Sequence, residues 1–451
     1  MVISLKKEKW KQRSAVAVGV ALLLIAIVIL TDAYQKIPFR KEVVLTVGVF
    51  SDSYWEVQNG YSYQILEDAI ALFEEEHPGV RVEYVSGILK EHYPEWLAEQ
   101  ILLEKAPDLF LVFGENFNDF AEIGALKDLS GLMESDDSFE KERFYSSALG
   151  CGRYGERQYA LPYECAPKLM FVNKTILTEE GIPLPGENWT WEDFYEICAA
   201  VTKDTDGNGT LDRFGVVGYT WSDAFDSNGV QLFDRRGTEC YLTGEEVREA
   251  ILFMEKLNGL HDGYSVGSKD FDLGNVAFQP MLFSEYRAYK PYPLSIKKYS
   301  GFEWECIPMP AGNHGANISE LDTLLLAMNA DTSQTDYAWD LMKLLSADER
   351  IQSEIFTYSE GMSVLKDVTE SDETLQLLIE RSGDHNGFNL DVLSDAVEHA
   401  AAAIGFRNRE EAMAEVDKAV REIMEGSSNI SMELIIWNRK INQFLKNQIN
   451  H

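Results

Sequence analysis

The spacing of hydrophobic positions alternates between a strand-like and a helix-like period along most of the chain. Runs of apolar residues predict strands at residues 43–50, 80–87 and 107–113. Amphipathic patterns between these runs predict helices at 61–78 and 93–106. This alternation is typical of a parallel sheet with crossover helices. No internal repeat and no long Pro-, Gly- or Ser-rich linker divides the chain, which indicates lobes that are intertwined in sequence.

The N-terminal region carries a basic stretch followed by an apolar segment. Residues 14–31 contain no charge, and a helix of that length spans about 27 Å, enough for a bilayer core. The basic flank favours the cytoplasm, so everything after residue 31 is expected outside. We favour a retained membrane anchor because the run is longer than the about 7 to 15 residues of a signal peptide. The alternative is a signal peptide that is cut after Ala33.

Composition indicates a large folded protein with an acidic surface. The chain has 451 residues, of which 45% are hydrophobic, and its net charge is −35. The first 42 residues are basic on balance, so the remainder is even more acidic than the whole. Such a surface repels nucleic acid and anionic lipid headgroups, and the length predicts about two to three domains.

Cysteine usage excludes several site types. The five cysteines are scattered, with no CxxC or Cys/His spacing, so neither a zinc site nor an all-disulfide framework is expected. One or two disulfides remain compatible with an external compartment. No cysteine precedes Cys151, and a lipid-modified N-terminal cysteine is therefore not expected.

The segment at 204–215, DTDGNGTLDRFG, supplies oxygen donors in the order of a calcium-binding loop. The predicted metal ligands are Asp204, Asp206, Asn208, the backbone carbonyl of Thr210, and Asp212. The twelfth position holds Gly215 in place of the bidentate Glu of an EF-hand, and the loop joins a predicted helix at 190–203 to a predicted strand at 214–219. The alternative is a metal-free turn, because Asp, Asn and Gly also favour turns on their own.

Several segments, taken in order, resemble a known family. They include FEEEHPGVRVEYV, APDLFLV, GALKDLS, YALPYECAPKLMFVNKTIL, PLPGENWTWEDFYEICAAVTKDTDGNGTLDRFG, FEWECIPMP and YAWDLMKLLSADERIQSEIF. Their order is similar to that of the family 1 extracellular solute-binding proteins, which deliver sugars to ABC importers. The resemblance covers nearly the whole chain after residue 42.

The resemblance implies an α/β fold of the periplasmic-binding-protein type II kind, with two intertwined lobes and a ligand cleft between them. By the family pattern, residues 43–163 with 315–358 form the first lobe, and residues 168–312 with 360–451 form the second. The implied crossings between lobes fall near 163–168, 312–318 and 359–362. In this family the acidic loop commonly lies between a helix and a strand, so it is expected to stiffen the second lobe away from the ligand.

Candidate ligand contacts lie in loops at the carboxyl ends of predicted strands, where small molecules bind in open α/β sheets. Carboxylates and amides suit sugar hydroxyls, and aromatic rings suit the apolar sugar face. The predicted ligand-binding residues are Asp52, Trp55, Glu115, Asn116, Tyr163, Glu164, Trp221, Asp223, Asp226, Phe283 and Tyr286. Each has a structural alternative: the aromatic residues as core or hinge packing, the acids as solvated loop residues.

The predicted function is carbohydrate binding for an ABC importer, with the permease subunits as partners and no catalytic turnover. A second hypothesis is a membrane-tethered ligand sensor. A third is an extracellular glycosidase that uses Asp223 and Asp226 as its carboxylate pair. The sequence contains no GxSxG, HExxH or GxxxxGK[ST] motif, and its seven His residues are isolated, which disfavours the enzyme.

Overall fold

The computed structural model describes residues 43–55, 61, 63–288, 302–382, 390–401, 405–426 and 429–449. The predicted anchor or signal segment at 14–31 lies outside these residues. Among the helices within the described ranges, none is both long and apolar enough to cross a membrane.

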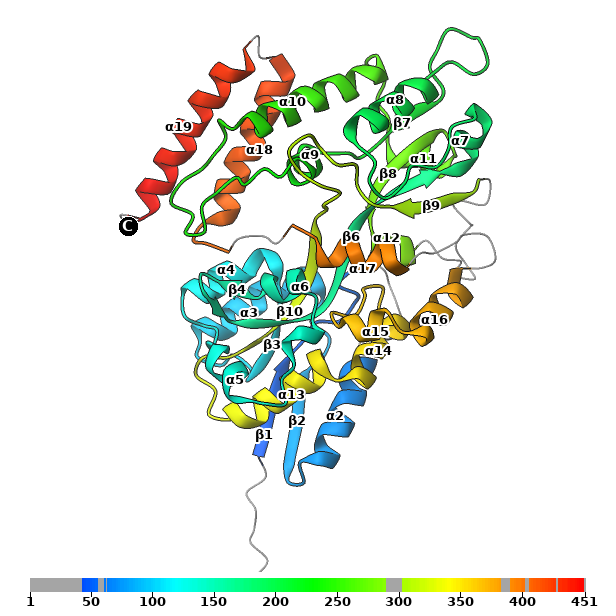
Figure 1. The fold of residues 1–451 in the computed structure, drawn as a ribbon. Coiled ribbons are helices and arrows are strands. Elements are labelled where there is room, and N and C mark those ends of the chain that lie inside the picture. The colour runs from blue at the N-terminus through cyan, green and yellow to red at the C-terminus, as the bar shows by residue number, and fades with distance from the viewer. Residues whose placement is uncertain are drawn as a thin grey trace, which may run out of the picture. The chain divides into compact units, whose positions relative to one another are not determined.

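The strands form a continuous hydrogen-bonded sheet in the order β2-β1-β3-β10-β6-β8-β7, with β9 also paired to β6 (Figure 1). Their bounds are β1 (Val43–Gly48), β2 (Val80–Val85), β3 (Leu109–Phe113), β6 (Ala160–Asn173), β7 (Phe214–Val216), β8 (Val276–Leu282), β9 (Trp304–Ile307) and β10 (Leu321–Met328). The pairs β1/β3 and β7/β8 are parallel, as the alternating pattern predicts. The long strand β6 and its neighbours β8, β9 and β10 are antiparallel, so the prediction of a parallel sheet is wrong at the centre.

The centre differs because β6 and β10 both run between the lobes, in opposite directions. Residues 160–167 of β6 pair with β10, and residues 168–172 pair with β8. The strand therefore leaves one lobe and enters the other at Pro167 and Lys168, inside the range 163–168 expected for the first crossing. The chain returns between Ala311, which pairs with Thr190, and the start of β10.

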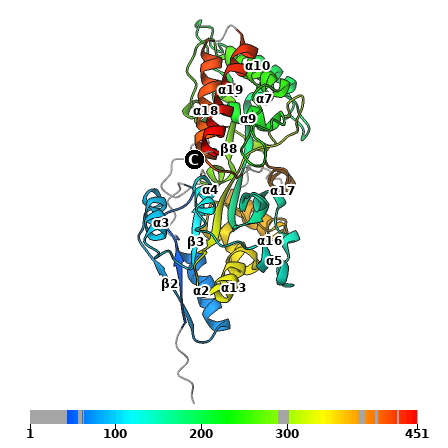
Figure 2. The same cartoon turned by 90° about the vertical axis from the view of Figure 1, so that its left-hand side faces the viewer.

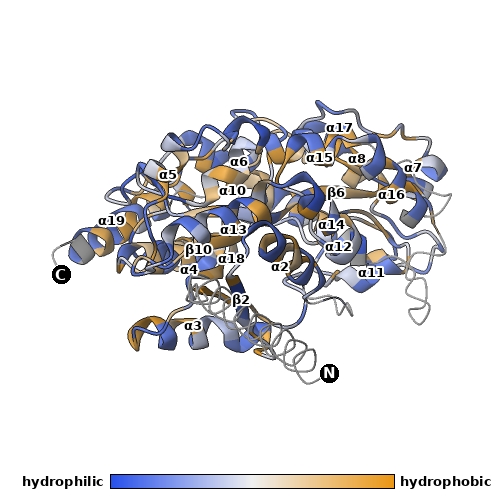
Figure 3. Ribbon diagram, turned by 90° about the horizontal axis from the view of Figure 1, so that it is seen from below, coloured by the Kyte–Doolittle hydropathy of each residue, from blue (hydrophilic) through white to orange (hydrophobic). Residues whose placement is uncertain are grey.

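The first lobe covers its part of the sheet with amphipathic helices. Their bounds are α2 (Gln64–Glu76), α3 (Tyr93–Leu102), α4 (Gly114–Glu122), α5 (Ser130–Ser135), α6 (Ser146–Cys151), α13 (Thr335–Ala347), α14 (Glu349–Tyr358), α15 (Lys366–Thr369), α16 (Asp372–Ser382) and α17 (Leu390–Glu398). Helix α2 buries Ile65, Leu66, Ala69 and Phe73 and presents its acidic residues to solvent. Figure 3 shows this two-faced character as orange and blue residues on the same helix.

The placement of α15 and α17 corrects the predicted third crossing. Met362 pairs with Cys165 and Leu365 pairs with Phe144, both in the first lobe. The Tyr145 hydroxyl also donates a 3.0 Å hydrogen bond to Ser394 of α17. The prediction that the chain crosses at 359–362, and that residues 360–400 belong to the second lobe, is therefore wrong. The apolar faces of these helices are buried against first-lobe elements, and the crossing comes only after Ala401, which pairs with Glu320.

The second lobe combines the middle of the chain with its last two helices. Their bounds are α7 (Lys174–Glu180), α8 (Trp191–Val201), α9 (Trp221–Ser227), α10 (Glu245–Asn258), α11 (Ser268–Asp272), α12 (Phe283–Ala288), α18 (Arg409–Gly426) and α19 (Ile430–Ile449). Helices α18 and α19 lie beside α10 in both views (Figures 1 and 2). Helix α8 begins with a capping box between Thr190 and Asp193, as its sequence predicts.

The core of the second lobe draws on both stretches of sequence. Phe194 of α8 and Ile251 of α10 share one buried cluster with Val416 of α18 and Ile441 of α19. All five cysteines are free thiols. Apolar packing, together with hydrogen bonds from the Leu242 and Cys240 backbone N–H groups to Asn438 and Asn442 of α19, therefore joins the last helices to the lobe.

Candidate ligand-binding site

A cavity of about 530 Å³ lies between the two lobes. The first lobe and the crossing segments contribute Gly114, Glu115, Phe117, Asn118, Cys151, residues 320–323 and Ala401. The second lobe contributes Trp221, Ser222, Phe225, Asp226, residues 230–233, Gly405, Phe406, Arg409, Glu410 and Met413. Three of the predicted ligand contacts, Glu115, Trp221 and Asp226, meet in this cavity although they come from separate loops.

Trp221 gives the cavity a fixed aromatic surface. It opens α9, whose start is capped by Thr220 and Asp223. Its indole Nε1 donates a 3.0 Å hydrogen bond to the Asp417 carboxylate, and its ring lies edge to face with Phe225 at 5.1 Å between centroids. The indole is only partly buried, so these contacts fix the orientation of a ring that still borders the cavity.

Acidic side chains dominate the polar lining. The pKa of Asp226 is raised to about 7, mainly by burial and also by the neighbouring carboxylates of Glu320 and Asp223, against the lowering effect of Lys168 and Arg409. Burial also raises the pKa of Asp322, although the Tyr54 hydroxyl donates a 2.9 Å hydrogen bond to it. The cavity therefore holds carboxyl groups whose ionised forms are poorly solvated.

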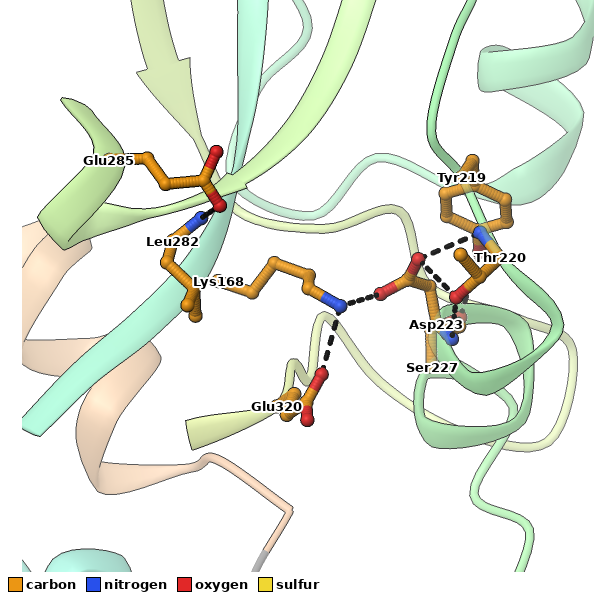
Figure 4. Close-up of polar contacts among 8 residues, drawn as sticks. All are labelled: Lys168, Tyr219, Thr220, Asp223, Ser227, Leu282, Glu285 and Glu320. Atoms are coloured by element: carbon orange, nitrogen blue, oxygen red, sulfur yellow. Dashed lines mark hydrogen bonds and ion pairs between the residues drawn. The ribbon is translucent and has the colours of Figure 1, made fainter. Parts of the chain in front are cut away.

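Lys168 links the crossing strands at the edge of the cavity. Its ammonium group lies 3.0 Å from Asp223 and 2.9 Å from Glu320 (Figure 4). Burial lowers the pKa of Lys168, but the two facing carboxylates more than offset this and hold it above its ordinary value. The contact connects β6 to α9 and to the start of β10, the segments on which the lobes turn.

Asp52, Tyr163 and Glu164 lie in a different place. They line a small cavity of about 70 Å³ inside the first lobe, which is room for a few water molecules and not for a sugar ring. Burial raises the pKa of Glu164 to about 7, against a hydrogen bond from the Ser359 hydroxyl that lowers it. Trp55 itself is 5% exposed. These four residues brace the first lobe where β6 leaves it.

The remaining predicted contacts also lie away from the cavity lining. Asp223 is 3% exposed and is committed to the cap of α9 and to Lys168. Phe283 is fully buried in the protein core, and Asn116 does not border the cavity. The side chain of Tyr286 lies outside the described part of the chain. Direct ligand contact is therefore retained as a prediction only for Glu115, Trp221 and Asp226.

Several cavity residues were missed by the sequence reasoning. Glu320 directly precedes β10 and Asp322 is its second residue, so attention to the strand that follows the second crossing would have identified them. Phe406 and Arg409 reach the cavity only through the third crossing, which was predicted about forty residues too early. No local sequence signal identifies that pair.

The acidic loop at 204–212 connects α8 to β7, as predicted. Asp204, Asp206 and Asp212 each offer a carboxylate oxygen within 4.8 Å of the other two. The Asp204 carboxylate also accepts backbone N–H groups of Gly207 and Gly209 at 2.7 and 2.6 Å. This all-oxygen donor set fits the hard cation Ca²⁺.

Comparisons with known proteins agree with this architecture. A model of the bacterial extracellular solute-binding protein family matches residues 58–350. An uncharacterised lipoprotein of Streptomyces antibioticus is 25% identical over 265 residues, and the chain spans about half (54%) of the length of that relative.

Solved structures share the fold at low sequence identity. The cyclic α-maltosyl-1,6-maltose binding protein of Arthrobacter globiformis aligns with a TM-score of 0.73 and 15% identity, covering 90% of this chain and 99% of that one. The sugar-binding protein MalE of Xanthomonas citri aligns with a TM-score of 0.72 and 14% identity, over 90% and 98% of the two chains. An ABC substrate-binding protein of Listeria monocytogenes, solved with cycloalternan, aligns with a TM-score of 0.66 and 18% identity, covering 90% of this chain and 99% of that one. With a two-lobed fold, an interlobe cavity and a family match over most of its length, the chain belongs to the bacterial extracellular solute-binding proteins.

Proposed function

We propose that this protein captures a sugar or oligosaccharide in the interlobe cavity and delivers it to the permease subunits of an ABC importer. The observation that carries the proposal is the cavity itself. It is large enough for a sugar, it is bounded by both lobes, and it combines the fixed Trp221 ring with acidic side chains. Carboxylates accept hydrogen bonds from sugar hydroxyls, and an indole face covers the apolar face of a sugar ring.

The structural neighbours support a carbohydrate over other solutes. The Arthrobacter neighbour is a cyclic α-maltosyl-1,6-maltose binding protein, the Listeria neighbour was solved with cycloalternan, and another neighbour is a cyclo/maltodextrin-binding protein in complex with maltotetraose. Identity to each of these proteins is below 20%, so they support the class of ligand and not a particular sugar.

The position of Asp223 favours binding over hydrolysis. A glycosidase needs two carboxyl groups that both reach the scissile bond. Asp223 is buried, caps α9 and faces Lys168, and it does not line the cavity in which Asp226 lies. Of the two carboxyl groups that the glycosidase hypothesis requires, Asp226 lines the cavity but Asp223 has a structural role outside it.

A membrane-tethered ligand sensor could use the same cleft. That alternative requires the protein to be held at the membrane. We propose that the segment at 14–31 holds the protein at the outer face of the membrane, in keeping with its extracellular family and with a relative described as a lipoprotein. Fractionation of cells that express the full chain tests this point. Recovery of protein that lacks the N-terminus from the medium would contradict a retained anchor.

We also propose that the loop at 204–212 binds a structural Ca²⁺. Asp204, Asp206 and Asp212 would hold the ion and stiffen the connection from α8 to β7. A chelator should then lower the melting temperature of the wild-type protein and leave that of Asp206→Ala unchanged. If neither chelator nor added Ca²⁺ changes the melting temperature of the wild-type protein, the metal-free turn is favoured.

A thermal-shift screen of the purified protein against neutral and charged sugars tests the proposed function. A ligand that binds only the folded state raises the melting temperature increasingly as its concentration rises above its Kd, by mass action. We expect at least one mono- or oligosaccharide to give a concentration-dependent shift without being consumed. Absence of a shift with every sugar, or steady release of hydrolysis products, would contradict the proposal.

A further inference from the structure

The interlobe cavity carries an excess of negative charge. Among the described residues that line it, Glu115, Asp226, Glu320, Asp322 and Glu410 are acidic, whereas Arg409 is the basic one. A neutral sugar needs hydrogen-bonding groups but no net charge in its site. The imbalance therefore requires a further explanation.

Ion pairs within the protein neutralise only part of this charge. Arg409 lies 2.7 Å from Glu410, and Lys168 lies 2.9 Å from Glu320. Glu115, Asp226 and Asp322 have no cationic side chain within ion-pair distance in the part of the chain that the structure describes. They come from α4, α9 and β10, so they reach the cavity from both lobes and from a crossing strand.

Two of these acids, Asp226 and Asp322, are held in an unfavourable environment. Burial is the main cause of the raised pKa of both Asp226 and Asp322, and the charge of Glu320 adds to it in each case. Four charged side chains face Asp226. The negative charges of Glu320 and Asp223 raise its pKa, and the positive charges of Lys168 and Arg409 lower it. A cation bound among these groups would favour their ionised forms and be strongly attracted, because the partly buried site screens charge less than water does.

A second, independent feature points to a ligand that donates hydrogen bonds. Asn118 of α4 lines the cavity and is 7% exposed, and its Oδ1 has no hydrogen-bond partner among the described residues. A buried acceptor without a donor is costly, so such groups are normally satisfied. A ligand rich in O–H and N–H groups would supply the missing donor.

We propose that the cavity selects carbohydrates that carry a protonated amino group, over neutral sugars of the same shape. This inference rests on the proposed carbohydrate function and names the class of sugar. The ammonium group would lie among Glu115, Asp226 and Asp322, while Trp221 covers the apolar face of a ring. Acidic sugars would be rejected by the same carboxylates. The net charge of −35 would also speed the approach of a cationic ligand.

The test compares pairs of sugars that differ only in the replacement of hydroxyl groups by ammonium groups. Glucose and glucosamine form one pair, with one replacement, and cellotriose and the β-1,4 trimer of glucosamine form a second, with one replacement on each ring. Titration calorimetry is carried out on the full-length protein in a buffer free of amines, at slightly acidic pH and at about 50 mM and about 500 mM salt. Maltotriose and a galacturonic acid trimer complete the panel.

We expect the amino sugar of at least one pair to bind about tenfold more tightly than its neutral partner at low salt, and this ratio to fall at high salt. Glu115→Gln keeps the size of an exposed side chain and should reduce the ratio several-fold. Glu156→Gln, in the exposed turn between β4 (Arg153–Tyr154) and β5 (Arg157–Gln158), removes the same charge at a residue that does not line the cavity and should leave the ratio unchanged.

Each outcome separates this inference from the function on which it rests. Neutral sugars that bind as tightly as their amino partners would overturn the selectivity and leave carbohydrate binding intact. A preference that falls equally in Glu115→Gln and Glu156→Gln would assign it to overall charge and would overturn the role of the cavity. If no sugar of the panel binds, both the inference and the proposed function fail.

Discussion

Trp221 is the aromatic side chain that borders the cavity with its orientation fixed by neighbours on two sides. If its indole covers a sugar ring, Trp221→Ala should weaken sugar binding by about 1 to 3 kcal/mol, in the range for removal of an aromatic anchor. The free energy of unfolding should change less, because the ring is only partly buried.

Trp221→Phe is the matched control for this measurement. It keeps an aromatic face but loses the hydrogen bond to Asp417. Calorimetric titration should rank the affinities as wild type, then Phe, then Ala. Equal affinity of all three proteins would show that Trp221 belongs to the scaffold and does not contact the ligand.

Asp226 predicts a pH dependence of stability. Its pKa in the folded protein is about 7, well above the ordinary value of 3.8 for an aspartate. The folded state thus binds this proton more tightly than the unfolded state does. The resulting stabilisation is fully present below the unfolded pKa and is lost as pH rises through about 7.

Asp226→Asn removes this titration while it keeps the shape of the side chain. The difference in free energy of unfolding between variant and wild type should therefore shift in favour of the variant from pH 4 to pH 8, as measured by urea denaturation. Glu164 has a similarly raised pKa, but its contribution cancels in the difference between the two proteins. A difference that does not vary with pH would contradict the assigned environment of Asp226.

At the scale of elements, Lys168 is the residue that ties β6 to α9 and to the start of β10 (Figure 4). Lys168→Met would leave Asp223 charged with a side chain that is 2% exposed, and we expect a loss of about 3 kcal/mol in the free energy of unfolding. Glu320→Gln removes the charge of the half-exposed partner of Lys168 and should lower the free energy of unfolding by about 1 kcal/mol or less. Chemical denaturation of both variants checks the ranking. Equal losses would mean that the contact with Asp223 is not the dominant one.

The elements themselves were largely predictable from the hydrophobic pattern. The helix α2, the strand β3 and the capped start of α8 all follow from local periodicity and local hydrogen bonding. The antiparallel centre and the late third crossing were not predictable in this way. They depend on which distant surface buries an apolar face, as when α17 packs on α6 although about 240 residues separate them.

The same distinction explains the outcome for the site. Glu115, Trp221 and Asp226 follow predicted strands directly, and the strand-end rule brought them to the cavity. Asp52 obeys the same rule, but its loop turns into the first lobe beside Glu164. Arg409 depends on the third crossing, so its place could not be derived without the tertiary structure.

At the scale of the whole molecule, a cavity bounded by both lobes implies closure around the ligand. A sugar can favour a closed form only by the difference between its affinities for the closed and open forms. Glu115 on the first lobe and Trp221 and Asp226 on the second supply contacts that can differ in this way. Ligands that touch one lobe alone would bind without closing the protein.

Small-angle scattering with and without a saturating sugar found in the thermal-shift screen tests this account most directly. We predict that the sugar lowers the radius of gyration of the wild-type protein. At matched saturation of Trp221→Ala, the decrease should be the same or smaller. A radius of gyration that stays unchanged while calorimetry shows full occupancy would contradict binding between the lobes.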